Sequence, residues 1–142
     1  MFEPESKEMP GAAEKILVID DETEILRYFK RLLTGQGYAV ETAGNSQAGC
    51  ELAEDPSVAV IISDLHMPGA LSKLDLIRKL RELRPDCPLV VVSGYPAAES
   101  LQICRELGVA EFLTRPFEIA FITSVLKQLR LRNSNPPDAK TQ

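Results

Sequence analysis

Short aliphatic runs alternate along this chain with longer segments in which apolar residues recur every three or four positions. The runs read KILVI, YAVETA, SVAVII, PLVVV and AEFL, and they predict strands at residues 15–19, 38–43, 57–62, 88–92 and 110–113. The periodic segments predict helices over 22–34, 46–54, 74 to the residue before Pro85, 98–107 and 117–131.

Continuous apolar strands that alternate with amphipathic helices indicate a parallel sheet with helices on both faces. Right-handed crossovers leave few topologies for such a sheet. The pattern therefore predicts an α/β fold, a doubly wound three-layer sandwich of five strands and five helices. In the last helix we expect Phe121, Val125 and Leu129 to form the buried face.

Polar groups follow four of the five predicted strands at the points where those strands end. These groups are Asp20-Asp21, Ser63-Asp64, Ser93-Gly94 and Thr114-Arg115-Pro116. In an open parallel sheet, ligands bind beyond the carboxyl ends of the strands, where the strand order reverses. We therefore expect these residues, which are distant in the sequence, to meet at one edge of the sheet.

Three carboxylates in one place would repel each other and raise each other's pKa. A hard divalent cation resolves this repulsion, and an all-oxygen ligand set suits Mg²⁺. Ser93 can donate a hydrogen bond to a phosphoryl oxygen, and Arg115 can pair with other phosphoryl oxygens. Taken alone, Asp21 with Glu24 is also compatible with a capping box that does no more than start a helix.

The motifs ILVIDDE, IISDLHMPG, VVVSGY and FLTRPF occur in this order. Through these four motifs the chain resembles a single-domain response regulator, that is, a receiver domain of two-component signalling. The resemblance covers residues 14–132 and implies a flavodoxin-like fold with strand order 2-1-3-4-5. Residues 1–13 and 133–142 are polar and proline-containing, and we expect them to be flexible tails.

By this resemblance, Asp64 is the phosphoacceptor, a carboxylate nucleophile that takes a phosphoryl group from a histidine kinase. The resemblance implies that Asp21 and Asp64 bind Mg²⁺ (or Mn²⁺) directly. Asp20 would act largely through water, and the backbone carbonyl of His66 would supply a further ligand.

The resemblance also implies a switch. Ser93 matches its hydroxyl and Phe112 its aromatic residue, and Pro116 matches a proline that is often preceded by a cis peptide bond. The two switch side chains would move toward the phosphoryl group and bias a surface formed by the fourth helix, fifth strand and fifth helix.

Two departures from the family pattern affect the predicted site. Arg115 stands where the family has lysine, and a planar, forked guanidinium is not equivalent to an ammonium group. We expect phosphorylation to survive and the lifetime of the phosphoryl group, or its coupling to the switch, to change. After Pro68 the segment GALSKLDLIRKL lacks an expected glycine, so we expect a remodelled loop there.

The charge distribution argues against a nucleic-acid partner. The net charge is −5, of which residues 1–14 contribute −3, leaving −2 for the rest. A group of basic residues in the third predicted helix is expected to be its solvated face; the group is Arg78, Lys79, Arg81 and Arg84. The partners implied by the resemblance are a histidine kinase or histidine phosphotransfer protein and a downstream protein target.

No run approaches the roughly 20 apolar residues that span a bilayer, so we expect no membrane association. Cys50, Cys87 and Cys104 are an odd number at wide spacings, which favours reduced, mostly buried thiols and a cytoplasmic location. We expect a monomer or a weak homodimer, and no enzymatic activity beyond self-catalysed phosphorylation and dephosphorylation.

Several alternatives stay open at this stage. The chain is also compatible with a degenerate receiver that binds partners without phosphorylation, or with a receiver fragment of a larger regulator or hybrid kinase. A haloacid-dehalogenase-type phosphatase is disfavoured, because that family needs D-x-D-x-T and the first strand here is followed by DDET. A flavodoxin-like FMN carrier would need a first loop rich in serine, threonine and glycine.

Overall fold

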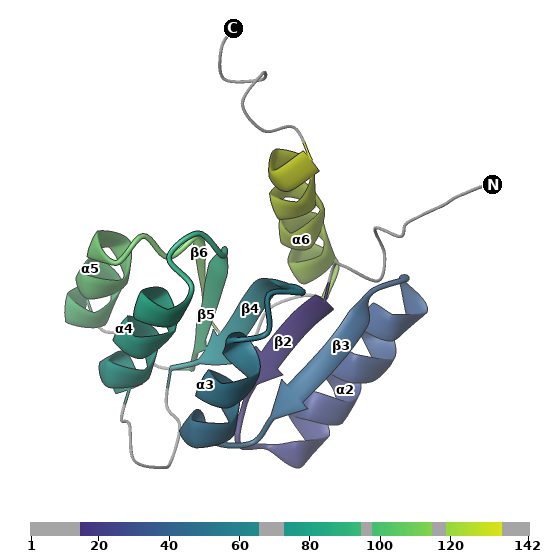
Figure 1. Cartoon of the computed structure of the whole chain (residues 1–142), viewed down its shortest axis with the longest axis horizontal. Coiled ribbons are helices and arrows are strands. Elements are labelled where there is room, and N and C mark those ends of the chain that lie inside the picture. The colour runs from purple at the N-terminus through teal and green to yellow at the C-terminus, as the bar shows by residue number, and fades with distance from the viewer. Residues whose placement is uncertain (1–14, 66–72, 95–97, 115–118, 135–142) are drawn as a thin grey trace, which may run out of the picture.

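The computed structural model describes residues 15–65, 73–94, 98–114 and 119–134 (Figure 1). Its strands are β2 (Lys15–Ile19), β3 (Ala39–Ala43), β4 (Val58–Asp64), β5 (Leu89–Ser93) and β6 (Glu111–Thr114). Its helices are α2 (Thr23–Gly35), α3 (Ser46–Ala53), α4 (Lys73–Leu83), α5 (Ala98–Glu106) and α6 (Ile119–Ser134). The predicted elements are therefore confirmed, with small differences at their ends.

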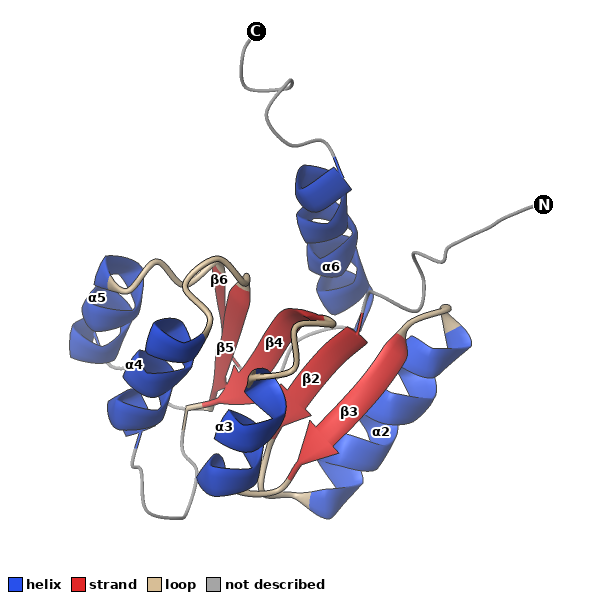
Figure 2. Ribbon diagram, viewed as in Figure 1, coloured by secondary structure: helices blue, strands red, loops and turns tan. Residues whose placement is uncertain are grey.

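The five strands form one parallel sheet in the order β3-β2-β4-β5-β6. Counted along the chain this is 2-1-3-4-5, so the predicted doubly wound topology is confirmed. Helices α3, α4 and α5 cover one face of the sheet, and α2 and α6 cover the other (Figures 1 and 2). The chain changes from one face to the other beside the central strands, so β2 and β4 meet at the switch point.

The core consists of two layers because the side chains of each strand alternate between the faces of the sheet. Leu17 and Ile19 of β2 pack in the cluster under α3, α4 and α5. Ile16 and Val18 of the same strand pack in the cluster under α2 and α6. Both faces of β2 are buried, which explains its continuous aliphatic run in place of an alternating pattern.

Helix α6 corrects one predicted core residue. Phe121 is 48% exposed, and it does not belong to the buried face. The buried residues of α6 are Ile122, Val125, Leu126 and Leu129. These follow the i, i+3, i+4, i+7 spacing of one helical face, and Phe121 lies about 100° away from Ile122 around the helix axis. Val125 and Leu129 were predicted correctly.

The basic group of α4 corrects a second interpretation. Arg78 is exposed and forms an ion pair with Asp75 at 3.5 Å, as a solvated face requires. Arg81 and Arg84 are only partly exposed, and their guanidinium groups donate hydrogen bonds to backbone carbonyls of the domain. For these two residues the predicted solvated face is wrong, because the long side chains reach past the helix end to carbonyl groups that have no partner inside a helix.

The three cysteines are free thiols, as predicted. Cys87 and Cys104 are buried and Cys50 is partly buried, and desolvation raises the pKa of each thiol above its ordinary value. A thiol with a raised pKa is a poor nucleophile, so these residues act as small apolar groups of the core. No helix among the described residues has the length and apolar composition that a bilayer crossing requires.

Candidate metal centre and phosphoryl site

The acidic pair begins where β2 ends. The backbone N–H of Asp20 donates to the carbonyl of Ala43 on the edge strand, at 3.0 Å. Its carboxylate Oδ1 then accepts the N–H of Glu22 at 2.9 Å, which is the local turn that aspartate favours. Asp20 is 3% exposed, whereas Asp21 is exposed. The first carboxylate is therefore held in place by the backbone around it, and the second faces solvent.

Helix α2 does not use Asp21 as its cap. The helix begins at Thr23, Glu22 occupies the N-cap position, and no side chain caps the first turn. The capping-box interpretation of Asp21 and Glu24 is therefore wrong. Asp21 stands one residue before the cap position, inside the turn that the Asp20 carboxylate makes with the N–H of Glu22.

Asp64 is the last residue of β4 and lies in the middle of the sheet. It is 5% exposed, and it pairs in register with Val92 of β5. The residue after it, Leu65, donates its N–H to the carbonyl of Val92 at 2.8 Å, and the Ser63 hydroxyl donates to the Asp64 carbonyl at 3.0 Å. The backbone that carries this carboxylate is therefore bonded on both sides of the residue.

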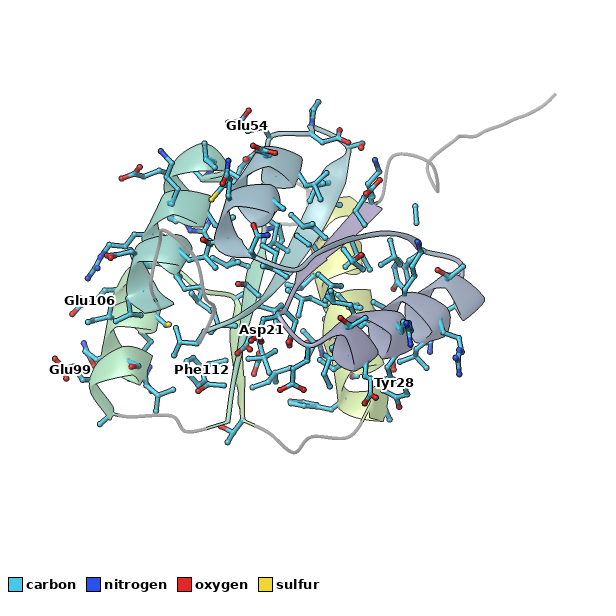
Figure 3. All side chains as sticks on the ribbon, turned by 90° about the horizontal axis from the view of Figure 1, so that it is seen from below. Asp21, Tyr28, Glu54, Glu99, Glu106 and Phe112 are labelled. Atoms are coloured by element: carbon cyan, nitrogen blue, oxygen red, sulfur yellow. The ribbon has the colours of Figure 1, made fainter. Side chains whose placement is uncertain are left out.

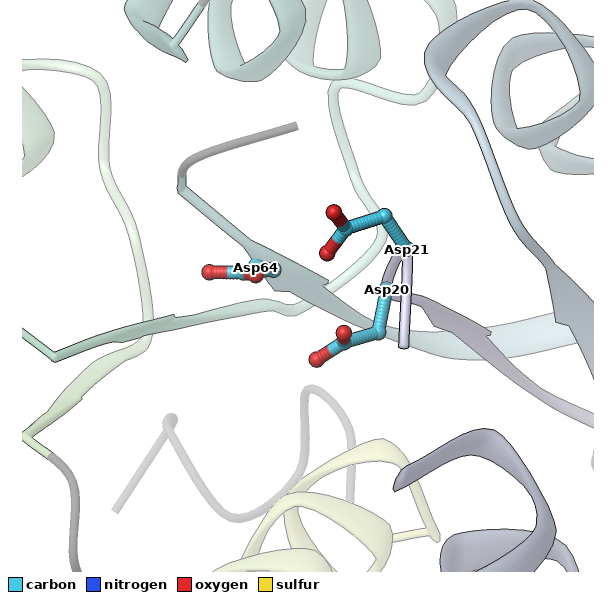
Figure 4. A group of neighbouring side chains, drawn as sticks. All are labelled: Asp20, Asp21 and Asp64. Atoms are coloured by element: carbon cyan, nitrogen blue, oxygen red, sulfur yellow. The ribbon is translucent and has the colours of Figure 1, made fainter. Parts of the chain in front are cut away.

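Asp20, Asp21 and Asp64 form one acidic cluster. Each offers a carboxylate oxygen, and these oxygens lie within 4.8 Å of one another. Figure 4 shows the three carboxyl groups projecting to the same side. Ile19 pairs with Ser63, so the residues that follow them are neighbours at the carboxyl edge of the sheet. Three hard oxygen donors at this spacing fit a divalent cation such as Mg²⁺ or Ca²⁺.

Ser93 and Phe112 lie on the strands beyond Asp64. Ser93 ends β5, is fully buried and follows Val92, the partner of Asp64. Phe112 of β6 is partly buried and packs against the core cluster under α3, α4 and α5. Figure 3 views Phe112 and Asp21 from below, toward the carboxyl ends of the strands. The hydroxyl thus stands on the strand adjacent to Asp64, and the aromatic ring stands one strand further out.

Three predicted residues, His66, Arg115 and Pro116, lie outside the described residues, as do residues 69–72, the start of the segment for which a remodelled loop was predicted. The sequence interpretation also did not single out Gly49, which packs closely against the strand that leads to Asp20. A Cβ at Gly49 of α3 would lie 2.7 Å from Cδ1 of Ile19, the residue before Asp20. A glycine inside a helix was the available signal for this close approach.

Comparison with known proteins identifies a family and its relatives. Residues 16–127 match the response regulator receiver domain. The photosynthetic apparatus regulatory protein RegA from Cereibacter sphaeroides is 30% identical over 127 residues, which cover 89% of this chain and 67% of RegA. The DNA-binding transcriptional regulator NtrC from Azospirillum brasilense is 33% identical over 128 residues, which cover 90% of this chain and 26% of NtrC.

A solved structure agrees with these sequence relatives. It is a response regulator protein from Burkholderia pseudomallei with a phosphorylated aspartic acid, a calcium ion and citrate. It has a TM-score of 0.72 and 30% identity, and the match covers 87% of this chain and 75% of the other. The match spans most of this chain, and the motifs at the strand ends carry the predicted resemblance. The chain therefore belongs to the response regulator receiver domain family of two-component signalling.

Proposed function

We propose that this receiver domain accepts a phosphoryl group on Asp64 from a histidine kinase or a histidine phosphotransfer protein. We further propose that the modification switches a protein-binding surface. The observation that carries the proposal is the convergence of three carboxylates from β2 and β4, with oxygens within 4.8 Å of one another, at the switch point of a doubly wound sheet. The buried hydroxyl of Ser93 ends the adjacent strand.

Asp64 is suited to be the acceptor because its backbone is fixed and its carboxylate stands at the end of a strand. In the proposed step, a carboxylate oxygen of Asp64 forms a bond to phosphorus while the phosphorus–nitrogen bond of the donor histidine breaks. The leaving imidazole takes up a proton, and the product is an acyl phosphate. Little covalent chemistry is asked of the protein, so positioning and charge stabilisation supply most of the acceleration.

The metal that we assign to this site is Mg²⁺ (or Mn²⁺). Asp21 and Asp64 would bind it directly, Asp20 largely through water, and the backbone carbonyl of His66 would add a ligand. A bound dication offsets the negative charge of the carboxylates and of the incoming phosphoryl group. The donor set fits because it consists of hard oxygens, and the Burkholderia relative holds a calcium ion together with a phosphorylated aspartic acid.

Three further side chains complete the proposed switch. The Ser93 hydroxyl would donate to one phosphoryl oxygen, and the Arg115 guanidinium, in place of the usual lysine, would pair with others. Phe112 would follow the movement of Ser93. The surface that responds would consist of α5, β6 and α6, and a downstream protein would bind there.

The remaining parts of the proposal concern context. We propose a cytoplasmic monomer or weak homodimer whose only chemistry is the phosphorylation and dephosphorylation of its own Asp64. The chain spans only 26% to 67% of the two curated relatives, so the output of the whole protein is also a proposal. NtrC is named as DNA-binding, whereas the net charge of −5 here supports contact with proteins rather than with nucleic acid.

The test is an amide NMR titration with Mg²⁺ and then with beryllofluoride, which mimics a phosphoryl group. Wild type should give shifts near Asp21, Asp64, Ser93 and Phe112, and Asp64→Asn should lose the beryllofluoride response. The matched control is Asp86→Asn, because it makes the same charge change at an exposed position before β5, at the opposite end of the sheet.

The outcomes separate the alternatives. A response to Mg²⁺ without a response to beryllofluoride would leave a metal-binding receiver whose switch is impaired. No response to either reagent would refute the proposal and favour a receiver that acts without phosphorylation.

A further inference from the structure

Arg84 lies just after α4 and reaches across to the two elements that precede that helix. Its Nη1 donates to the carbonyls of Ala53 and Asp55, each at 2.9 Å, and its Nη2 donates to the carbonyl of Val58 at 2.9 Å. Ala53 is the last residue of α3, and Val58 is the first residue of β4. One guanidinium therefore connects the end of α4 to the end of α3 and to the start of β4.

Arg81 lies in the last turn of α4 and makes the complementary connection. Its Nη1 donates to the carbonyls of Arg84, Pro85 and Cys87, at 3.3, 2.9 and 3.2 Å. Its Nη2 donates to the carbonyl of Gly108 at 3.1 Å. Gly108 follows α5 with a φ of +76° and forms the C-terminal cap of that helix. Arg81 therefore connects the loop after α4 to the cap of α5.

These contacts lie at the end of the sheet opposite to the acidic cluster. Val58 begins β4 and Asp64 ends it, and six steps along a strand span about 20 Å. The three helices that the arginines connect are the complete helical layer on one face of the sheet (Figure 1). Cationic donors at three helix C-termini also complement the negative ends of the helix dipoles.

The geometry needs arginine in particular. A guanidinium presents five N–H groups in a fixed plane, so it can bond several separate carbonyls at once, whereas a lysine ammonium is a compact point charge on a flexible stem. In the described part of the chain, Nε of Arg81 is buried without a hydrogen-bond partner. Nε is thus shielded from water, while the two terminal nitrogens of the same guanidinium bond backbone carbonyls.

We propose that Arg81 and Arg84 are positioning residues that form a double clamp on the far ends of α3, α4 and α5. Arg84 joins α3 and β4 to α4, and Arg81 joins α4 to α5. The clamp holds these far ends together. Movement of α4 and α5 when the site is phosphorylated is therefore restricted to the helix ends nearest the acidic cluster. The last statement rests on the proposed function, whereas the clamp itself does not.

Native-state amide hydrogen exchange tests the clamp through a crossed pattern. Arg84→Lys should speed exchange about tenfold at Asp55 and Val58 and leave Gly108 and Val109 near wild type. Arg81→Lys should do the reverse. Arg78→Lys is the matched control on the same helix, because Arg78 is exposed and forms its ion pair with Asp75 of α4 itself. Equal acceleration at all four amides in both variants would indicate general destabilisation and would overturn the division of roles.

The wild-type protein supplies a test that needs no variant to fold. Helix α2 ends in a glycine-based cap like that of α5, with Gly37 at a φ of +98°. Helix α2 has no basic residue in its last turn, whereas α5 has Arg105 there in addition to the hydrogen bond from Arg81 to its cap. We expect amides at the α5 cap to exchange about tenfold more slowly than those at the α2 cap. Equal or faster exchange at the α5 cap would refute the clamp.

The third test measures amide NMR shifts on addition of beryllofluoride with Mg²⁺. In wild type, shifts in α4 and α5 should be confined to the halves nearest the acidic cluster, and in Arg81→Lys they should extend to Gly108. Confinement in both proteins would remove the functional part of the inference. If beryllofluoride produces no shifts anywhere, the proposed function fails, and the crossed exchange pattern still decides the clamp.

Discussion

Replacing Asp64 with asparagine should stabilise the metal-free protein, although it removes the residue that the site is built around. Asp20 and Asp21 are adjacent in the chain, so they repel each other in the unfolded state as well. Folding adds the two pairs that Asp64 makes, with oxygens within 4.8 Å. Asp64→Asn deletes both pairs and keeps the size of the side chain.

The magnitude follows from Coulomb's law. At 4.8 Å, one pair of like charges costs about 0.9 kcal/mol with the dielectric constant of water and about 3.5 kcal/mol with an effective value near 20. Because Asp21 is exposed, the lower figure applies to its pair with Asp64. Asp20 and Asp64 are both buried, so their pair costs at least as much, and the two pairs together give at least about 2 kcal/mol. Some of this is offset by poorer hydrogen bonding of the amide, so we expect a gain of about 1–2 kcal/mol.

The assay is urea denaturation followed by circular dichroism, in EDTA and in MgCl₂. In EDTA, Asp64→Asn should have the higher unfolding free energy. Mg²⁺ at ten times its Kd should stabilise wild type by about 1.4 kcal/mol. It should stabilise Asp64→Asn less, because the variant has lost a metal ligand, so the difference in unfolding free energy between the two proteins should become smaller. Asp86→Asn should differ little from wild type in either buffer.

Two results would refute this reasoning. One is an Asp64→Asn protein that is no more stable than wild type in EDTA, because the carboxylates would then not repel appreciably in the folded state. The other is equal stabilisation of both proteins by Mg²⁺, because Asp64 would then not be a ligand.

The remaining predictions concern three separate positions. Folding lowers the pKa of Asp55 from 3.8 to about 2. The main cause is the hydrogen bond that its carboxylate accepts from the Ser57 N–H, and the next is the hydrogen bond from Lys15 at 2.9 Å. The contribution of the Asp55 carboxylate to stability is therefore complete above pH 3.8 and is lost as the pH falls through 2. The difference in urea midpoint between wild type and Asp55→Asn should accordingly be constant near neutral pH and disappear between pH 4 and 2; a constant difference down to pH 2 would contradict this. Gly49→Ala should lower the unfolding free energy by about 1 kcal/mol, because overpacking against β2 outweighs the gain in helix propensity, and a more stable variant in the same urea assay would count against that close approach. Arg115→Lys should change the rate of dephosphorylation measured by the decay of phosphorylated protein, and an unchanged rate together with an unchanged conformational response would show that the substitution is neutral.

The predicted elements were found because local patterns determine them. Aliphatic runs such as VVV in β5 can be buried on both faces only in a sheet that is covered on both sides, and the helices carry a clear 3.6-residue period. The candidate site was found for a related reason. Polar residues that follow buried strands in a parallel sheet must gather at one edge, whichever side chains lie between them in the sequence.

Side-chain direction at element ends was less predictable. Phe121 lies next to the apolar stripe of α6, so the sequence pattern assigns it to the buried face. In the structure the buried stripe begins one residue later, at Ile122, and Phe121 is exposed. Asp21 stands one residue before the N-cap position, which Glu22 occupies. In both cases a shift of one position reverses the interpretation, and the sequence pattern does not resolve shifts of that size.

The sequence by itself determined the alternation of strands and helices, the parallel sheet and the identity of the acidic residues. Each of these depends on the periodicity of nearby residues or on the type of residue at a strand end. Only the tertiary structure decided that the carboxylate oxygens converge within 4.8 Å, and that Arg81 and Arg84 bind carbonyls up to 31 residues away. Such contacts depend on the packing distance and orientation of separate elements, and a guanidinium in a helix has the same local pattern whether it faces water or a neighbouring helix end.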